Sequence, residues 1–204
     1  MQRKTIRYTK NFFYGIALAV VSLFCIFPFL WMLTLSLKTR AQSYDPSILF
    51  FLPTSENYRA IFSDSSIVSL IVNSVIVSVC TSIVSLILGG MTAYGLSRYR
   101  FRHNSDLSFW ILSLRMIPAM AAVIPFFIIA STVKLFDSQI LLIICYTLFN
   151  IPFVVWMMKS FLDDIPAEVE EAASIDGCSL FQRIYKIVLP LAVPGLIATL
   201  IFCI

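Results

Sequence analysis

The chain has 204 residues, of which 59% are hydrophobic and only 13% are charged. Soluble globular domains are about half apolar and about a quarter charged, so this composition excludes a soluble domain built around one core. The formal net charge of +4 is too small for a nucleic-acid-binding surface, and aromatic and basic residues do not interleave along the chain. These values indicate a membrane protein, with lipid and no nucleic acid around it.

The five cysteines and the single histidine follow no metal-binding or disulfide pattern. The cysteines are odd in number, form no C-x-x-C pair, and four of them lie in or beside apolar runs. We interpret them as small hydrophobic residues and expect no disulfides, no metal ligands and no cofactor. His103 stands in a basic stretch, where a lone histidine is usually a solvated side chain. The cysteines are Cys25, Cys80, Cys145, Cys178 and Cys203.

A basic segment, residues 1–11, precedes the first apolar run. That run, residues 12–37, is long enough to span roughly 30 Å of bilayer hydrocarbon at about 1.5 Å per residue. It is too long for a signal peptide, and no small-residue cleavage site follows it, so we predict an uncleaved first helix. Residues 38–65 are polar and contain two X-Pro turn signals, which indicates an outside loop with a short surface helix.

Further apolar runs follow along the chain. The predicted spans are residues 12–37, 67–96, 107–133, 139–161 and, incompletely, 191–204. The last run would form only about 22 Å of helix, which suggests a truncated product or a fragment. We therefore predict an all-α membrane protein, a polytopic helical bundle with four complete spans and a truncated fifth, within a single transmembrane domain over residues 1–204.

The distribution of lysine and arginine predicts the orientation of these spans. Basic residues concentrate in cytoplasmic loops, so the richer side is expected to face the cytoplasm. That side carries the N-terminus and the polar interval 163–190. Its basic residues are Arg3, Lys4, Arg7, Lys10, Arg98, Arg100, Arg102, Lys159, Arg183 and Lys186, against Lys38, Arg40, Arg59 and Lys134 on the other side.

The polar interval 163–190 predicts two short helices joined at a glycine. Pro166 suits the first helical position, and the acidic residues that follow it suit a helix N-terminus. Gly177 suits the left-handed position that ends the first helix, and residues 179–182, SLFQ, form a capping box that begins the second. The second helix is expected to end at Leu189-Pro190.

This interval could be a docking surface or a loop that lies on the membrane. Ala172 and Ala173 would let another backbone approach closely, and Glu168, Glu170 and Glu171 would offer charge to a partner. Amphipathic segments on lipid are usually rich in lysine and arginine, whereas the first helix here is acidic. The pattern therefore favours docking to a protein.

Several stretches of the sequence resemble one family. Glu171-Ala172-Ala173, three residues, Gly177, nine residues and Ile187-x-Leu189-Pro190 match the complete EAA signature of the membrane subunits of ABC importers. The stretches NYRAIF, AYGLSRYRF, IPFVVWMMKSFLDDIPAEVEEAASIDG and LPLAVPG are similar to carbohydrate-type permeases, such as those of maltose, trehalose and polyol importers. The resemblance covers nearly the whole chain from about the first membrane helix onward.

The resemblance implies a permease subunit that translocates a sugar or polyol across the bacterial cytoplasmic (inner) membrane. Residues 163–190 would be its cytoplasmic coupling loop. The implied partners are two ATP-binding cassette subunits, a second permease subunit and an extracytoplasmic solute-binding protein. The sequence has no G-x-x-x-x-G-K-[ST] loop, so ATP would be bound and hydrolysed by a partner, and we expect no catalytic residues. The implied ATPase-coupling residues are Glu171, Ala172, Ala173, Asp176 and Gly177.

Three polar residues inside the predicted spans are candidates for the translocation path: Arg115, Asn73 and Asn150. Arg115 falls roughly 12 Å into its span, where a cation is costly unless it faces protein or water. It could line the path or pair with the partner permease, or it could cap carbonyls freed by Pro118 or extend to the interface. The two asparagines are expected to be buried amides that bond between helices or contact a sugar. Pro118 and Pro125 predict a bent or locally unwound third span.

Aromatic residues of the third and fourth spans could stack on sugar rings, although packing and lipid contact explain them more simply. They are Phe126, Phe127, Tyr146, Phe149, Phe153 and Trp156.

Two other functions remain open from the sequence. An ABC permease for a non-sugar solute would carry the same EAA signature. A secondary transporter could use broken helices at Pro118 and at residues 150–152 as its site, but ion coupling would require acidic residues within the spans, and the sequence places none there.

Overall fold

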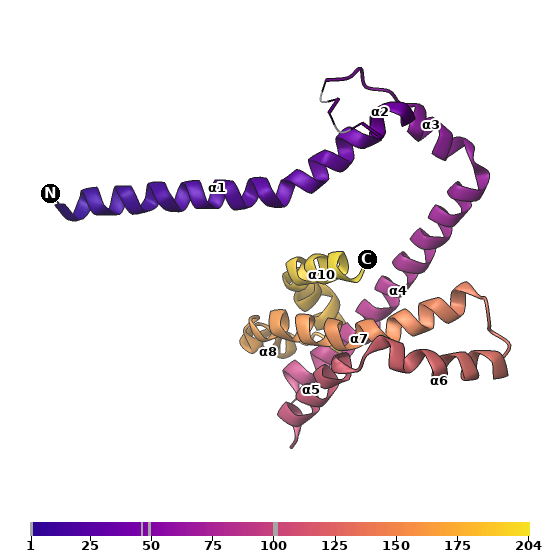
Figure 1. The fold of residues 1–204 in the computed structure, drawn as a ribbon. Helices are drawn as coiled ribbons and strands as arrows, with labels where there is room; N and C mark the ends of the chain where they lie inside the picture. Colours follow the sequence, from indigo (N-terminus) through magenta and orange to yellow (C-terminus); the bar gives the residue numbers. More distant parts are fainter. Residues whose placement is uncertain (1, 46, 49, 100–101) are drawn as a thin grey trace. The chain divides into compact units, whose positions relative to one another are not determined.

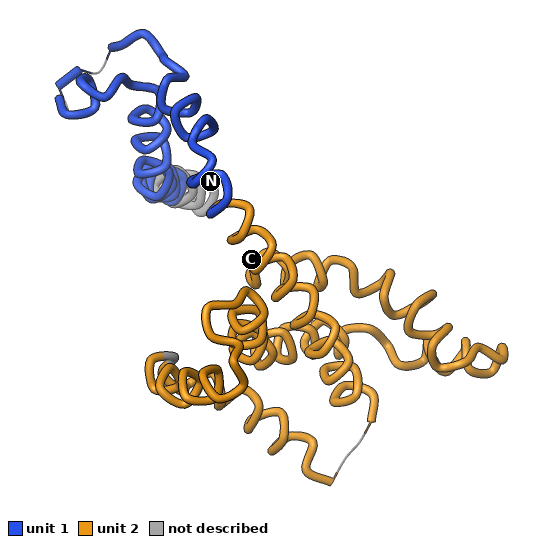
Figure 2. Tube along the Cα trace, turned by 90° about the vertical axis from the view of Figure 1, so that its right-hand side faces the viewer, with its two compact units in different colours: residues 1–70 blue, residues 71–204 orange. Residues whose placement is uncertain are grey.

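Helices dominate the part of the chain that the computed structural model describes, which is residues 2–45, 47–48, 50–99 and 102–204 (Figure 1). This part contains no β-strand, so the all-α prediction is confirmed. The chain divides into two compact units, residues 1–70 and residues 71–204 (Figure 2).

Unit 1, residues 1–70, is a long apolar helix followed by short ones. Its helices are α1 (Gln2–Ser36), α2 (Arg40–Ser43), α3 (Glu56–Ser63) and the first residues of α4 (Ser65–Arg98). The amide of Asn57 ties α3 to the end of α1, because its Nδ2 donates to the carbonyls of Ser36, at 3.0 Å, and Lys38, at 2.7 Å. These bonds satisfy carbonyls that a helix end leaves free. The predicted short helix between the first two spans is therefore present as α2 and α3.

Unit 2, residues 71–204, contains the remaining helices and all the candidate sites. Its elements after α4 are α5 (Asn104–Ser113), the 3-10 turn η1 (Leu114–Met116), α6 (Ala119–Thr132), α7 (Gln139–Asp163), α8 (Ala167–Ile175), α9 (Leu180–Arg183), the π-turn η2 (Ile184–Val188) and α10 (Leu189–Cys203).

Helices α4 and α7 run parallel to each other, and small residues of α4 form the contact. A Cβ atom added at Gly89 would lie 2.6 Å from Cγ1 and 2.8 Å from Cβ of Val154, so the two backbones approach closely. Small residues permit such contacts between membrane helices. Three pairs along the helices mark the parallel register: Asn73 with Gln139, Gly89 with Val154, and Ser97 with Asp163.

Helix α10 packs antiparallel against α7 in the same way. A Cβ atom at Gly195 would lie 2.5 Å from the ring of Phe161. One turn later the buried Thr199 hydroxyl donates to the Gly195 carbonyl, at 2.7 Å, and contacts the sulfur of Met158, at 3.6 Å. The buried core between the helices consists of Ala93, Val154, Met158, Leu162, Val188 and Ala192.

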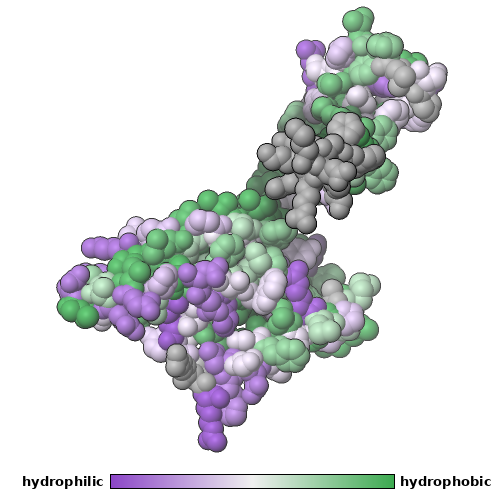
Figure 3. Space-filling model, turned by 90° about the vertical axis from the view of Figure 1, so that its left-hand side faces the viewer, coloured by the Kyte–Doolittle hydropathy of each residue, from purple (hydrophilic) through white to green (hydrophobic). Residues whose placement is uncertain are grey.

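Among the residues that the structure describes, four helices are long and apolar enough to cross a membrane: Tyr14–Ser36, Ser65–Arg98, Gln139–Asp163 and Leu180–Cys203. The pair Asn104–Met116 and Met120–Thr132 meets the same criteria together, so a fifth span is present if this bent pair counts as one. Their apolar side chains are largely exposed, and Figure 3 shows broad hydrophobic areas on the visible face. Lipid is the solvent that suits such a surface.

The third span bends by 89° between its two helices, as predicted from Pro118. Ile117 has extended backbone angles, φ −68° and ψ 123°, because a residue before proline is disfavoured in the helical region. Pro118 is the N-cap residue of α6, immediately before its first helical residue. Pro125, the other predicted breaker, lies inside α6, which continues through it.

The predicted end of the second loop helix at Leu189-Pro190 is wrong. Residues 180–203 form one continuous helix, in which η2 joins α9 to α10, so the fifth apolar helix begins at Leu180 and not at residue 191. Proline removes one backbone bond and clashes with the carbonyl four residues earlier in a regular α-helix. The π-turn just before Pro190 changes that geometry, with the Leu189 amide donating five residues back to Ile184.

We expect Gly89→Ala to destabilise the protein, because its new methyl group would collide with the base of the Val154 side chain. Overpacking of this kind costs about 1–3 kcal/mol. Gly90→Ala is the matched control, since nothing lies within 4 Å of a Cβ at that position. Thermal unfolding of the purified protein in detergent measures both variants. Equal melting temperatures for the two would contradict the close α4–α7 contact.

Candidate functional site

The turn between α8 and α9 is fixed by two hydrogen-bonded caps. Gly177 has φ +84°, a left-handed conformation that glycine adopts without strain. The amide of Gly177 donates to the Ser174 carbonyl, at 3.1 Å, and that of Cys178 to the Ala173 carbonyl, at 3.0 Å, which is the Schellman pattern of a helix end. The predicted glycine joint is therefore confirmed.

The second cap is the predicted box at the start of α9. The backbone N–H of Gln182 donates to the Ser179 hydroxyl, at 3.4 Å, and the backbone N–H of Ser179 donates to the side-chain Oε1 of Gln182, at 2.8 Å. Pro166 is the residue that precedes α8 and not its first helical residue, so that detail of the prediction is corrected by one position.

The five predicted coupling residues lie together on α8 and its C-terminal turn, and four of them face outward. Exposed positions are Glu171, Ala172, Asp176 and Gly177. Ala173 is the exception, because it is 7% exposed and faces the rest of unit 2. Helix α8 thus has one face that packs inward and another that is available to a partner.

The expectation that Glu170 offers its charge to a partner is wrong, because this residue of α8 is buried within unit 2. Its carboxylate is buried, accepts a hydrogen bond from the Tyr94 hydroxyl at 2.7 Å, and forms an ion pair with Nε of Arg98. The sequence pattern indicates a helix N-terminal charge at Glu170 and an orientation signal at Arg98, and it does not pair the two residues. The sequence contains one indication that two buried residues lie on the same side of α8, because Glu170 and Ala173 are three residues apart and therefore share a helix face.

Arg98 also binds the joint between α7 and α8. Its two terminal nitrogens donate to the carbonyls of Leu162, at 3.0 Å, and Ile165, at 3.1 Å. A second contact lies beside it, since the carboxylate of Asp163 accepts from the Ser97 hydroxyl at 2.6 Å and from Lys159 at 2.6 Å. The last turn of α4 is therefore bonded to the whole α7–α8 joint.

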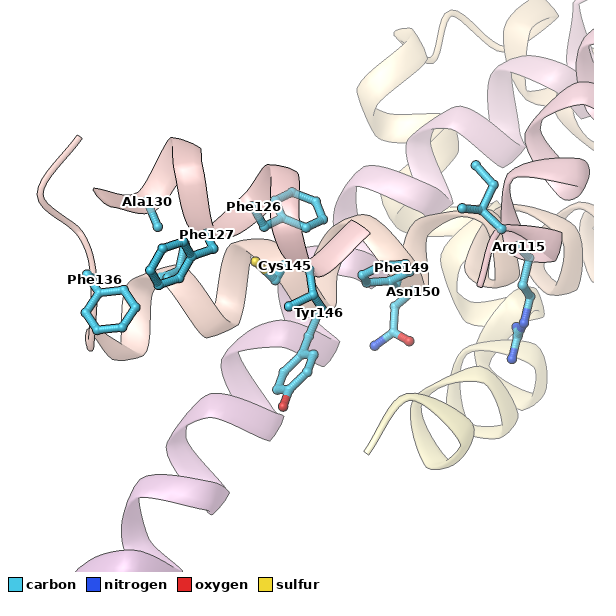
Figure 4. A pocket seen from close by; sticks show the side chains of 12 residues that line it. Arg115, Phe126, Phe127, Ala130, Phe136, Cys145, Tyr146, Phe149 and Asn150 are labelled. Carbon is cyan, nitrogen blue, oxygen red and sulfur yellow. The ribbon is translucent and has the colours of Figure 1, made fainter. Parts of the chain in front are cut away.

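A separate pocket of about 670 Å³ lies between α6 and α7 (Figure 4). It brings together two of the three path candidates, Arg115 and Asn150, and Figure 4 shows Arg115 at the opposite end from Phe136. Most other lining residues are aromatic or aliphatic. They are Ile117, Val123, Phe126, Phe127, Ala130, Phe136, Leu141, Cys145, Tyr146 and Phe149.

Arg115 is exposed and lies in η1, at the bend of the third span. Its guanidinium stands 4.4 Å from the ring centre of Phe153, a cation–π contact with α7. An aromatic ring thus lies against the charge, in a span where the sequence predicts that an unpaired cation is unfavourable.

Asn73 lies outside the lining of the pocket. Its Oδ1 accepts from Nε2 of Gln139 at 2.9 Å, so the predicted bond between helices is confirmed for this residue. The expectation that both amides are buried is wrong, because Asn73 is exposed and Asn150 is only partly buried. Among the residues that the structure describes, no three His, Cys, Asp or Glu side chains are grouped closely enough to hold a metal ion.

Comparisons with known proteins identify the family. Residues 85–204 match the family described as binding-protein-dependent transport system inner membrane component. The inner membrane ABC transporter permease protein YcjP of Escherichia coli K12 is 36% identical over 95% of this chain and 70% of its own length. The trehalose transport system permease protein SugB of Mycobacterium tuberculosis is 33% identical over 87% of this chain and 65% of its own length.

A third relative, the galactooligosaccharides transport system permease protein GanQ of Bacillus subtilis, is 32% identical over 94% of this chain and 69% of its own length. The crystal structure of a bacterial ABC transporter involved in the import of the acidic polysaccharide alginate matches with a TM-score of 0.72 and 26% identity, over 95% of this chain and 68% of that one. The chain thus spans about two thirds of the length of these proteins. Together with the apolar helices, these matches show that the chain is a multi-pass membrane protein of the binding-protein-dependent transport system inner membrane component family, the permeases of ABC transporters.

Proposed function

We propose that this chain is the permease subunit of an ATP-driven importer that carries a sugar or polyol across the cytoplasmic membrane. Relatives named for transport of trehalose and galactooligosaccharides support carbohydrate as the substrate class. The subunit works with a second permease subunit, two ATP-binding cassette subunits and an extracytoplasmic binding protein. It supplies the path and the docking surface and is not itself catalytic, since its partners bind and hydrolyse ATP.

The outer face of α8 is the observation that carries this proposal. It presents Glu171, Ala172, Asp176 and Gly177 at the surface on a turn that is held by two caps. A small, rigid, acidic helix end of this kind suits a cleft in a partner protein. The N-terminus lies in the cytoplasm, and so does α8, the coupling helix that docks to the ATPase.

Coupling in this proposal is mechanical. Closure of the ATPase pair on ATP displaces the docked α8, and the displacement moves the membrane helices between inward-open and outward-open arrangements. No chemical step occurs on this chain.

The pocket between α6 and α7 is the part of the path that this subunit contributes. Sugar recognition combines aromatic surfaces, which stack on the ring, with a few polar groups that bond its hydroxyls. The pocket offers rings from Phe126, Tyr146 and Phe149 beside the Asn150 amide and the Arg115 guanidinium.

We expect Glu171→Ala and Gly177→Asp to abolish co-purification of the ATPase subunit with the protein in detergent. The first removes an exposed charge from the docking face. The second places an L-residue and a charge at φ +84°, which distorts the turn. The amount of ATPase recovered by pull-down of the full complex measures both effects.

Asp106→Ala is the matched control for charge, because Asp106 is an exposed carboxylate in α5, outside the α8–α9 turn. It should leave ATPase recovery unchanged. Full recovery and normal uptake with Gly177→Asp would overturn the docking role of α8. ATP-independent uptake by the wild-type protein would instead favour a secondary transporter.

We expect Asn150→Ala to raise the KM of sugar uptake about tenfold, the effect of losing one buried hydrogen bond to the substrate. Asn73→Ala makes the same chemical change outside the pocket, where the amide is already bonded to Gln139, and should change KM little. Uptake by proteoliposomes that contain the whole transporter measures both. Equal KM values for the two variants would count against the pocket.

We expect Arg115→Ala to lower uptake without lowering protein abundance, since the side chain is exposed and contributes little to packing. Arg115→Lys keeps the charge but loses the guanidinium that lies over the Phe153 ring, so it should retain an intermediate rate. Membrane abundance by immunoblot and initial uptake rates separate the two effects. A parallel fall in both quantities would indicate a purely structural arginine.

A further inference from the structure

We propose that Arg98 and Glu170 form the link through which a displacement of α8 reaches the membrane helices α4 and α7. The inference rests on the proposed function, because it assumes that a partner moves α8. It goes further by assigning the transmission to a particular pair of side chains, which act as positioning residues and touch neither ATP nor substrate.

The first support is the number of segments that Arg98 joins. From the last turn of α4, its guanidinium reaches the last turn of α7 at Leu162, the joint at Ile165 and the first turn of α8 at Glu170. Each of the three contacts uses a different nitrogen of the same planar group. A rigid group bonded to three segments at once moves with all of them.

The second support is the electrostatic arrangement at the joint. The C-terminus of α7 leaves carbonyls free and carries partial negative charge, which a guanidinium complements. The N-terminus of α8 carries partial positive charge, which the Glu170 carboxylate complements. The ion pair therefore sits across two helix ends of opposite polarity and stabilises the angle between them.

The third support is burial. The side chains of Arg98 and Glu170 are only 12% and 6% exposed. Separating them would leave two charges away from water without their partner, which is strongly unfavourable. The pair therefore stays closed during small displacements of α8, whereas an exposed ion pair would exchange readily with water.

The two faces of α8 have different roles: the outer face meets the partner, and the inner face contacts the other helices of unit 2. Glu171 and Ala172 point away from the bundle, toward a partner, while Glu170 and Ala173 point into it. A force applied to the outer face thus reaches Arg98 through a single short helix. The neighbouring contact of Ser97 with Asp163 holds α4 to α7 at the same level, so both helices move together.

The experiment uses the complete transporter in proteoliposomes and measures the number of ATP molecules hydrolysed per sugar imported. We expect Glu170→Gln and Arg98→Ala to raise this number by about tenfold or more, the change that loss of one charge-assisted hydrogen bond makes in an equilibrium. The subunits should remain assembled, because the docking face of α8 is untouched. Arg98→Lys keeps the charge but cannot bond all three acceptors, so an intermediate value is expected.

Two control variants remove charge from exposed positions nearby. Asp164→Asn changes a carboxylate in the same joint, and Arg102→Ala changes an exposed cation four residues after Arg98. Both should keep the wild-type ratio. A residue needed only for folding would lower assembly, ATP hydrolysis and uptake together and leave the ratio unchanged, and that result would overturn the proposal.

Tyr94→Phe keeps the test decisive if removal of a buried charge prevents assembly. This change deletes one hydrogen bond to Glu170 and retains the aromatic ring. We expect the ratio to rise about twofold to threefold, less than for Glu170→Gln, because the ion pair between Glu170 and Arg98 remains. A wild-type ratio for Tyr94→Phe and Arg98→Lys would refute the link while leaving the proposed function intact. Absence of ATP-driven uptake by the wild-type complex would reject both.

Discussion

Backbone hydrogen bonding is the constraint on which the rest of this structure depends. In an apolar surrounding every free N–H or C=O is expensive, so helices must continue, break beside other protein groups, or end against side chains. Each solution occurs in unit 2. The chain continues through Pro190 by a π-turn, bends at Pro118, and ends α4 where Asn104 donates to the Leu96 carbonyl at 2.8 Å. Arg98 serves the end of α7 in the same way.

The helices and the glycine turn follow from the sequence because they are local properties. Apolar runs, Gly177 and the SLFQ box each specify a backbone conformation within a few residues. The pair formed by Arg98 and Glu170 could not be predicted, because its members are 72 residues apart. Their contact depends on the parallel packing of α4 and α7, which a run of small residues permits but does not specify.

The path candidates illustrate the same limit. Polarity within an apolar helix identified Arg115, Asn150 and Asn73 equally well, since all three are unusual in a span. Only the packing separates them, because α6 folds back along α7 after the bend and two of the three line the pocket there, beside aromatic rings. Asn73, near the start of α4, instead meets the first residue of α7. The packing of the helices thus decides which of the three residues lies beside the pocket.

The π-turn between α9 and α10 has a consequence for how this family is aligned and engineered. A π-turn holds about one residue more than an α-turn, and one residue corresponds to about 100° of rotation around a helix. Deleting a single residue from Ile184–Val188 would therefore convert the π-turn into a regular α-turn and keep the direction of α9 and the Gly177 loop relative to α10, whereas the same deletion within the regular helix α10 would rotate the residues before it by about 100°. A one-residue gap within this segment is thus compatible with an unchanged direction of the loop, whereas a gap further along α10 is not.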